Sequence, residues 1–261
     1  MRAVFSLTTA ESKRLIAKGV VNTPVIQHAL HNGKIIIAGG ITNAYVVEEL
    51  LGIKIEEKYR YTAGIVTQGG FQCVTPAEDR IQPYVVEQGK VSDKLWVEAL
   101  EEFTADDVMV KGANALDAEG IAGVIVSNPA GGTIGRALGI VSARGSNLLV
   151  PVGLEKMVPS VSAAARAAGI GRMDYSLGQP VGLIPIINGT VITEIIALEQ
   201  MFDVKATCIG CGGVGGSEGA VTLVIEGSRV PEALKLIKSI KGEPAVIGKK
   251  QRCRCQNPCN R

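Results

Sequence analysis

The chain has 261 residues, a hydrophobic content of 46%, an aromatic content of 4% and a formal net charge of +2. An apolar content made of Val, Ile, Leu and Ala suits helix-covered sheets, and the small charge without a basic stripe excludes nucleic acid as the default partner. No apolar run reaches the roughly 18 to 20 residues of a spanning helix, and charged residues stand where a secretory signal is apolar, so we expect a cytoplasmic protein without a membrane partner.

Residues 1–178 are predicted to form the main α/β domain, which holds a ligand cleft. Thr8 and Glu11 have the spacing of a capping box, so the chain should open in a helix. Residues 34–38 are typical of a strand, and after a glycine turn the next helix should end at Gly52. Further strands are expected at 65–67, 84–87, 107–111, 120–127 and 147–152, with helices capped by Ser92 and running through 131–144. This alternation predicts a mostly parallel, Rossmann-like sheet that contains 34–38, 107–111 and 147–152.

Residues 179–248 are expected to form a small second unit with a ferredoxin-like α+β order. Its strands are predicted at 181–187, 205–210 and 220–226, and its helices at 192–202 and 231–240. Residues 249–261 are a basic tail that contains cysteines. Because this tail lies beyond the last core element, we expect it to be dispensable for folding, with reduced thiols.

Two glycine turns stand where predicted strands hand over to helices. They comprise Gly39, Gly40, Thr42 and Asn43 in the first and Gly131, Gly132 and Thr133 in the second. Backbone N–H groups and the positive end of the following helix favour an anion at such turns. The alternative is a plain tight turn, with Thr42 as an N-cap. Because turns after parallel strands share one sheet edge, we expect both to face one cleft that binds a phosphate, carboxylate or nucleotide.

Five further positions complete the candidate site. Lys111 ends an apolar strand and can pair with an anionic ligand, while Asn114 and Asp117 can hydrogen-bond its hydroxyl groups. Lys156 lies near another strand end, and Glu218 stands among glycines that let a backbone approach a ligand closely. Lys111, Lys156 and Glu218 are therefore the candidate catalytic groups. Solvated strand-end lysines and a flexible hairpin loop are the alternatives.

The order of these motifs resembles the superfamily of ribose-5-phosphate isomerase, glucosamine-6-phosphate deaminase and coenzyme A transferases. The Thr42-led helix and its glycine turn resemble the isomerase's phosphate-binding turn. Residues 111–114 and 131–133 resemble its strand-end acidic motif and later glycine turn, and 153–156 occupy the place of a lysine-bearing loop. The small C-terminal unit resembles the isomerase's inserted domain. The resemblance implies a sugar phosphate, nucleotide or coenzyme A ester as ligand, with isomerisation or group transfer as the reaction.

The chain departs from the isomerase pattern at the two acidic positions, which hold Lys111 and Asn114. A lysine and an amide do not act as the base that moves a proton between carbons near neutral pH unless the pKa is strongly shifted. The sequence therefore predicts a small anionic metabolite as the partner, bound by an enzyme or by a non-catalytic sensor with the same cleft. We also expect a homo-oligomer.

The cysteines gather at the C-terminal end, where five of the six follow residue 207. Cys208 and Cys211 have a spacing that suits zinc or an iron–sulfur cluster, and the tail adds Cys253, Cys255 and Cys259. A regular strand would place residues three apart on opposite faces, and the tail spacing matches no standard site. A metal or redox protein based on these cysteines is therefore the alternative function.

Overall fold

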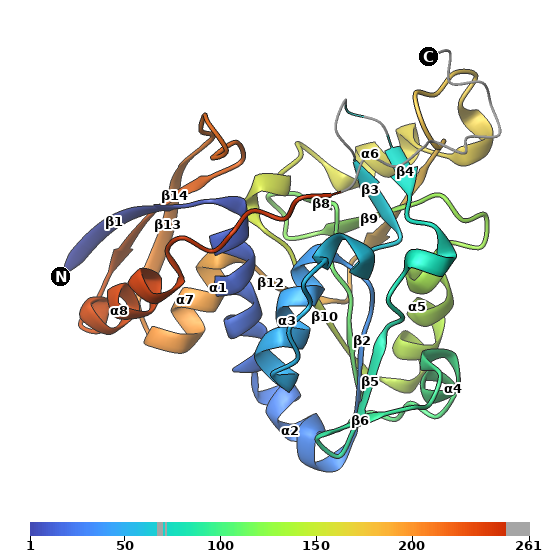
Figure 1. Cartoon of the computed structure of the whole chain (residues 1–261), viewed down its shortest axis with the longest axis horizontal. Helices are drawn as coiled ribbons and strands as arrows, with labels where there is room; N and C mark the ends of the chain where they lie inside the picture. The colour runs from blue at the N-terminus through green and yellow to red at the C-terminus, as the bar shows by residue number, and fades with distance from the viewer. Residues whose placement is uncertain (67–69, 71, 249–261) are drawn as a thin grey trace.

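The computed structural model describes residues 1–66, 70 and 72–248. Within them the chain is a mixed α/β protein with eight α-helices and four sheets, the largest of which lies at the centre (Figure 1). None of the helices in this described part has the length and apolar character needed to cross a membrane.

The central sheet has the strand order β12-β10-β7-β2-β5-β6. Its parallel strands are β2 (Lys34–Ile37), β7 (Val108–Val110), β10 (Asn147–Pro151) and β12 (Thr190–Ile192), and the antiparallel strands β5 (Tyr84–Glu87) and β6 (Lys90–Ser92) extend one side. The prediction that 34–38, 107–111 and 147–152 contain parallel strands of one sheet is confirmed. The sheet as a whole is mixed.

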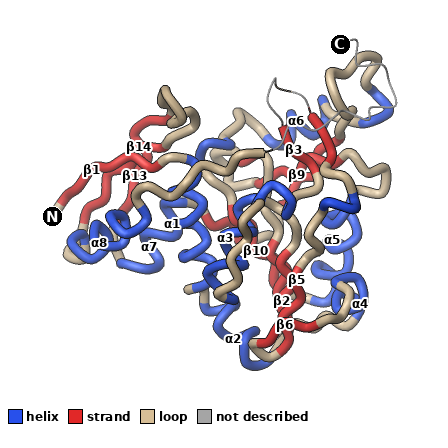
Figure 2. The backbone as a smooth tube through the Cα atoms, viewed as in Figure 1, coloured by secondary structure: helices blue, strands red, loops and turns tan. Residues whose placement is uncertain are grey.

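Helices bury both faces of the central sheet. On one face lie α1 (Thr9–Val21), α2 (Pro24–Asn32), α3 (Ile41–Leu51) and α7 (Glu194–Phe202), and on the other α4 (Trp96–Glu101) and α5 (Gly132–Arg144) (Figure 2). Successive strand residues point to opposite faces, so Ile35 and Ile37 join the first core and Ile36 the second. An unbroken apolar strand is therefore buried on both sides.

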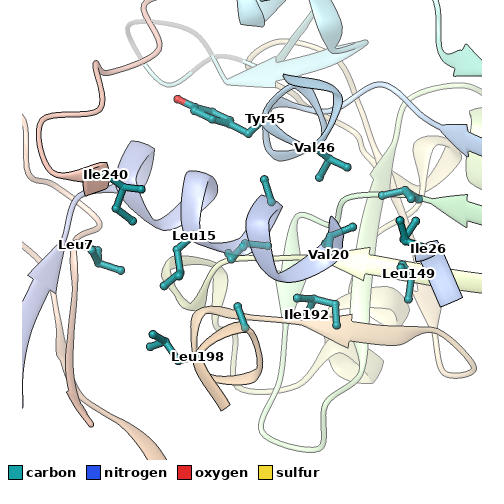
Figure 3. Close-up of a cluster of buried hydrophobic side chains, with 14 of the residues drawn as sticks. Leu7, Leu15, Val20, Ile26, Tyr45, Val46, Leu149, Ile192, Leu198 and Ile240 are labelled. Atoms are coloured by element: carbon teal, nitrogen blue, oxygen red, sulfur yellow. The ribbon is translucent and has the colours of Figure 1, made fainter. Parts of the chain in front are cut away.

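A second sheet pairs the two ends of the described chain, and we call it the terminal sheet. It consists of β1 (Arg2–Leu7), β14 (Val221–Glu226) and β13 (Lys205–Cys211), all antiparallel, with β1 beside β14 (Figure 1). Helices α1, α7 and α8 (Val230–Ile240) cover its inner face, where Leu7, Leu15, Leu198 and Ile240 meet (Figure 3). The predicted helical opening begins only at Thr9, where the capping box of Thr8 is confirmed, and strand β1 was missed.

Helix α1 links the two sheets, since it packs against α3 and α7 and contacts β1 of the terminal sheet as well as β10 and β12 of the central sheet. A Cβ at Gly19 would lie 2.5 Å from Cβ of Ala197, so glycine is needed for this close approach of α1 and α7. Charged groups fix the chain that follows α8: Glu11 accepts hydrogen bonds from Lys241 Nζ at 2.6 Å and from the N–H of Gly242 at 2.9 Å.

The strands of the predicted small unit at 179–248 belong to three different sheets. Its first strand is β11 (Gly182–Ile186), which pairs with β9 (Ala122–Val126) in an antiparallel outer sheet that also contains β8 (Ala115–Leu116). The helix expected from 192 begins at Glu194, because Thr190–Ile192 joins the central sheet as β12. The segment therefore contributes strands to three sheets, and the predicted strand at 120–127 lies outside the central one.

Two smaller predictions also changed. The strand expected at 65–67 is β3 (Gly64–Val66), which pairs only with β4 (Gln72–Val74) within the described residues; residue 67 lies outside them. The Ser92 hydroxyl does not cap α4, which begins at Trp96; it donates to Glu87 and accepts from the N–H of Lys94.

Candidate functional site

The carboxyl ends of β2, β7, β10 and β12 meet at one edge of the central sheet because these strands are parallel. The chain that follows them supplies polar side chains, and the start of α1 lies against the same edge. We call the group of Lys13, Lys111, Glu155, Lys156 and Glu194 the strand-end cluster.

Hydrogen bonds tie the members of the strand-end cluster to the loops around them. Lys13 Nζ donates to Glu155 Oε1 at 3.1 Å, in a pair whose side chains are each 12% exposed. The N–H of Leu154 donates to Glu194 Oε2 at 3.0 Å, so the loop after β10 is bound to the strand end of β12. Lys156 Nζ donates to the carbonyl oxygen of Ala113 at 2.8 Å, which joins it to the loop after β7.

The two lysines are held in an unfavourable environment for their charge. Burial lowers the pKa of Lys111 to about 8, and the positive charge of Lys156 acts in the same direction. Burial likewise lowers the pKa of Lys156 to about 8, although Glu155 and Glu194 oppose the shift and Lys13 adds to it. Lys111 Nζ donates to the carbonyl oxygen of Gly112 at 3.1 Å, and neither lysine forms a salt bridge within the described residues.

Glu194 is suited to exchange a proton near neutral pH. Burial raises the pKa of its carboxyl to about 7, with the negative charge of Glu155 in support and backbone N–H groups and the Ser12 hydroxyl in opposition. Its neighbour Glu155 keeps one oxygen, Oε2, buried and without a hydrogen-bond partner in the described structure. A Cβ at Gly153 would overlap that oxygen, so glycine is required beneath this carboxylate.

The first glycine turn lies beside the strand-end cluster, but its groups are partly engaged. Gly40 is the N-cap of α3 and its N–H donates to the carbonyl oxygen of Tyr61 at 2.6 Å; Thr42, the N-cap of the alternative interpretation, is the second residue of the helix. Asn43 Nδ2 bridges the ends of β2 and β7 by donating to the carbonyl oxygens of Ala38 and Val110. The buried Thr42 Oγ1 and Asn43 Oδ1 have no partner among the described residues.

Gly39 and Gly112 complete this edge. A Cβ at Gly39 would lie 3.2 Å from the carbonyl oxygen of Tyr61, and the corresponding position at Gly112 lies 3.5 Å from Asn43 Oδ1. Gly112, which follows Lys111 in the chain, therefore lies next to the amide oxygen of Asn43, which has no partner among the described residues. The predicted ligand-binding residues of the first turn and Lys111 are thus brought together at one edge.

The second glycine turn belongs to another place in the fold. It follows β9, a strand of the antiparallel outer sheet, so the shared-edge argument does not hold for it. Gly131 and Gly132 have φ of 77° and 60°, and Thr133 is the second residue of α5. Asn128 accepts from the N–H groups of Ala130 and Gly131 at 2.8 Å, so the turn satisfies part of its own backbone.

A cavity of about 630 Å³ lies at this second turn. Its walls come from β9, the turn, α5, the end of α6 (Val161–Ala167) and β11, and include Gly131, Ala168, Ile170 and Ile184. Residues 39–43 are not among the residues that line it. This cavity is mainly surrounded by small and apolar groups, whereas the ionisable side chains gather at the strand-end cluster.

Asn114 and Asp117 serve the backbone of the outer sheet. Asn114 Oδ1 accepts from the N–H of Ile125 at 3.0 Å. Asp117 accepts from the N–H groups of Glu119 and Ile121 with one oxygen and from that of Val161 with the other. These contacts give both side chains a structural role.

Glu218 lies in the glycine-rich loop at 212–219 that joins β13 to β14 (Figure 1). It is exposed, and its Oε2 accepts from the N–H of Gly216 at 2.9 Å. The end of the loop nevertheless approaches the strand-end cluster, because a Cβ at Gly219 would lie 3.6 Å from Cβ of Glu155.

Cys208 and Cys211 lie on the same side of β13, with their sulfur atoms 3.8 Å apart. The expectation of opposite faces was wrong because a β-bulge interrupts the register: Cys208 is opposite Leu223, but Gly210 is opposite the next residue, Thr222. Within the described residues no group of three or more His, Cys, Asp or Glu could hold a metal ion. The predicted zinc or iron–sulfur site would need further ligands, and Cys253, Cys255 and Cys259 lie outside the described residues.

No protein-family model matches the chain, and no curated protein matches its sequence. The residues of the site are therefore supported by their geometry alone. Lys13 and Glu194 were not identified from the sequence. Glu194 carried one usable signal, since it follows Thr193, whose hydroxyl caps α7 at the end of a strand. Lys13, in the middle of a helix, carried none.

Proposed function

We propose that the protein binds a small anionic metabolite at the strand-end cluster, with Lys111 and Lys156 as its cationic groups. The observation that carries the proposal is the pair of partly buried ammonium groups that have no salt bridge within the described residues. Holding each lysine charged at neutral pH in this environment costs about 3 kcal/mol. An anion bound between them would offset that cost, because an opposite charge favours the protonated form.

Glu194 supports a catalytic role for this site. A carboxyl with a pKa of about 7 is matched to proton transfer at neutral pH. Lys111 and Asn114 replace the carboxylates that sugar-phosphate isomerases carry after this strand, and Glu194 would supply the base from a different strand end. The reaction proposed is therefore isomerisation or group transfer on a sugar phosphate, nucleotide or coenzyme A ester.

The proposed kinship is with the superfamily of ribose-5-phosphate isomerase and coenzyme A transferases. Parallel strands with anion-binding groups at their carboxyl ends support a Rossmann-like relationship. The terminal sheet with its covering helices supports a ferredoxin-like relationship. A non-catalytic sensor would bind the metabolite with the same lysines, but Glu194 would transfer no proton. An assay for conversion of the bound metabolite therefore distinguishes an enzyme from a sensor.

The test is a thermal-shift panel of ribose 5-phosphate, adenine nucleotides and acetyl coenzyme A against the protein and three variants. A ligand at 100 times its dissociation constant adds roughly 2.7 kcal/mol to folding stability. We expect that stabilisation to be lost in Lys111→Met and Lys156→Met and kept in Lys54→Met, an exposed lysine paired only at the surface with Glu56. Equal stabilisation of all four proteins by the same ligand would place the binding site elsewhere.

A further inference from the structure

The β-bulge in β13 brings two thiols into position for a covalent bond. Cys208 and Cys211 Sγ atoms are 3.8 Å apart, and a disulfide requires about 2.05 Å. The remaining movement is small and falls on an edge strand of the terminal sheet, where β13 has a neighbour on one side only. A Cβ at Gly210 would meet no atom within 4 Å, so the backbone between the two cysteines has room to adjust.

The two thiols differ in access. Cys211 is exposed, whereas Cys208 is half-buried against the core beneath the terminal sheet. An external reagent can therefore reach the pair through Cys211, and Cys208 stands within reach as the second thiol. The glycine loop that follows Cys211 leaves the approach open, since Gly212, Gly215 and Gly216 have no atom within 4 Å of their Cβ positions.

We propose that Cys208 and Cys211 form a reversible intramolecular disulfide by exchange with a low-molecular-weight disulfide such as oxidised glutathione. One cysteine thiolate attacks a sulfur of the external disulfide, so that a mixed disulfide forms and one glutathione thiolate leaves. The second cysteine thiolate then attacks the protein sulfur of the mixed disulfide and releases the second glutathione thiolate. Both glutathione thiolates take up the protons lost by the two cysteines, and the protein loses two electrons to the glutathione pair.

The surroundings of the pair do not stabilise a thiolate, so they do not favour its reduced form in that way. Partial loss of contact with water raises the pKa of the exposed Cys211 to about 11, and the hydrogen-bonded Cys208 thiol and the carboxylates of Glu194 and Glu155 act in the same direction. A stabilised thiolate makes a disulfide easy to reduce, and here the thiolate is disfavoured while the disulfide carries no charge. This inference concerns the thiols alone and does not depend on anion binding at the strand-end cluster.

The test follows one tryptic peptide of the full-length protein in glutathione buffers of increasing oxidised fraction. Residues 206–229 contain Cys208 and Cys211 and no other cysteine, so a disulfide between them is a loss of two hydrogens within a single peptide. Samples are quenched with an alkylating reagent and analysed by mass spectrometry. We expect complete loss of alkylation on this peptide in oxidised glutathione and full recovery after reduction.

Matched variants distinguish the intramolecular bond from other oxidation. In Cys208→Ser and Cys211→Ser the remaining cysteine should keep a glutathione adduct, because the second thiol of the pair has been removed. Cys73→Ser should leave the behaviour of the peptide unchanged, since Cys73 is buried in another part of the fold. The proposal is overturned if the peptide of the unaltered chain stays fully alkylatable, keeps a glutathione adduct, or is protected by a bound zinc ion.

Discussion

Lys13 of α1 and Glu155 of the loop after β10 form an ion pair of 3.1 Å across the boundary between the terminal and central sheets. Each side chain is 12% exposed, so both charges are largely withdrawn from water. Within the described residues Glu155 has one oxygen engaged and one without a partner, and Lys13 Nζ also donates to the carbonyl oxygen of Thr9. The pair therefore holds the strand-end cluster together while leaving acceptor capacity at its centre.

Breaking this pair should destabilise the fold more than breaking a surface pair. We expect Lys13→Met or Glu155→Gln to lower the free energy of unfolding by about 2 to 4 kcal/mol, because the remaining charge loses its partner. In the double variant the loss should be smaller than the sum. Urea denaturation in a double-mutant cycle measures the coupling.

Arg2 and Glu226 form the control pair, since Arg2 is 78% exposed. Arg2→Met should change the free energy of unfolding by less than about 1 kcal/mol. Equal losses of the free energy of unfolding at the two pairs would show that the Lys13–Glu155 ion pair stabilises the fold no more than a surface pair.

Stability should rise with pH above 8 because of the two partly buried lysines, Lys111 and Lys156. Folding lowers the pKa of Lys111 and of Lys156 from 10.5 to about 8, so between these values the unfolded chain binds more protons than the folded chain. The penalty of burying the charge is complete below pH 8 and is relieved as the pH approaches 10. Urea denaturation at a series of pH values from 7 to 10 measures the slope.

Lys111→Met should be more stable than the unaltered protein at pH 7 and should show a flatter slope above pH 8, since it removes one of the two buried charges. Lys54→Met, at an exposed position, should keep the full slope. A slope unaffected by Lys111→Met would mean that this lysine is well solvated.

Glu194 should act in the opposite sense at lower pH. Folding raises the pKa of its carboxyl from 4.5 to about 7, so in this interval the folded chain binds more protons and stability falls as the pH rises. Glu194→Gln should flatten this dependence, and Glu232→Gln, an exposed carboxylate on α8, should not. The comparison is made by urea denaturation between pH 5 and 8; identical curves for Glu194→Gln and the unaltered protein would contradict a buried, protonated carboxyl.

Gly153→Ala tests the position of the Glu155 carboxylate. The added Cβ overlaps Glu155 Oε2, so the side chain must move and its bond with Lys13 should be lost, at a cost of about 1 to 3 kcal/mol. Gly139→Ala is the matched control, because that Cβ meets nothing within 4 Å in the interior of α5 and should stabilise the protein by roughly 0.5 to 1 kcal/mol. Thermal denaturation distinguishes the two; a stabilising Gly153→Ala would show that Glu155 moves without loss.

The sequence was most informative where the chain is buried on both sides. The apolar runs containing Ile36, Met109 and Val150 predicted strands of one sheet. An unbroken apolar run that is too short for a helix is typical of a strand buried on both faces. It was less informative about edges. Strand β1 alternates exposed and half-buried residues and pairs with β14, more than 200 residues away in the chain, so no local pattern indicated it.

The part of the candidate site that follows long buried strands could also be predicted from the sequence. Lys111 and Lys156 follow buried strands and could be placed at a sheet edge, but Glu194 depends on the three-residue strand β12, which is too short to give a periodic signal. The shared face of Cys208 and Cys211 depends on a bulge, which changes the register by one residue and leaves no mark in the composition.

The pairing of β1 with β14 joins Arg2 to Glu226 and Leu7 to Val221. During synthesis β1 is made more than 200 residues before β14, its only partner in this sheet among the described residues. Contacts between residues so distant in the chain raise the contact order and slow folding. The chain loses the entropy of closing the long loop before the hydrogen bonds between the strands can form. The terminal sheet should therefore form late, and until then the exposed edge of β1 is the part of the nascent chain that a chaperone would need to shield from other chains.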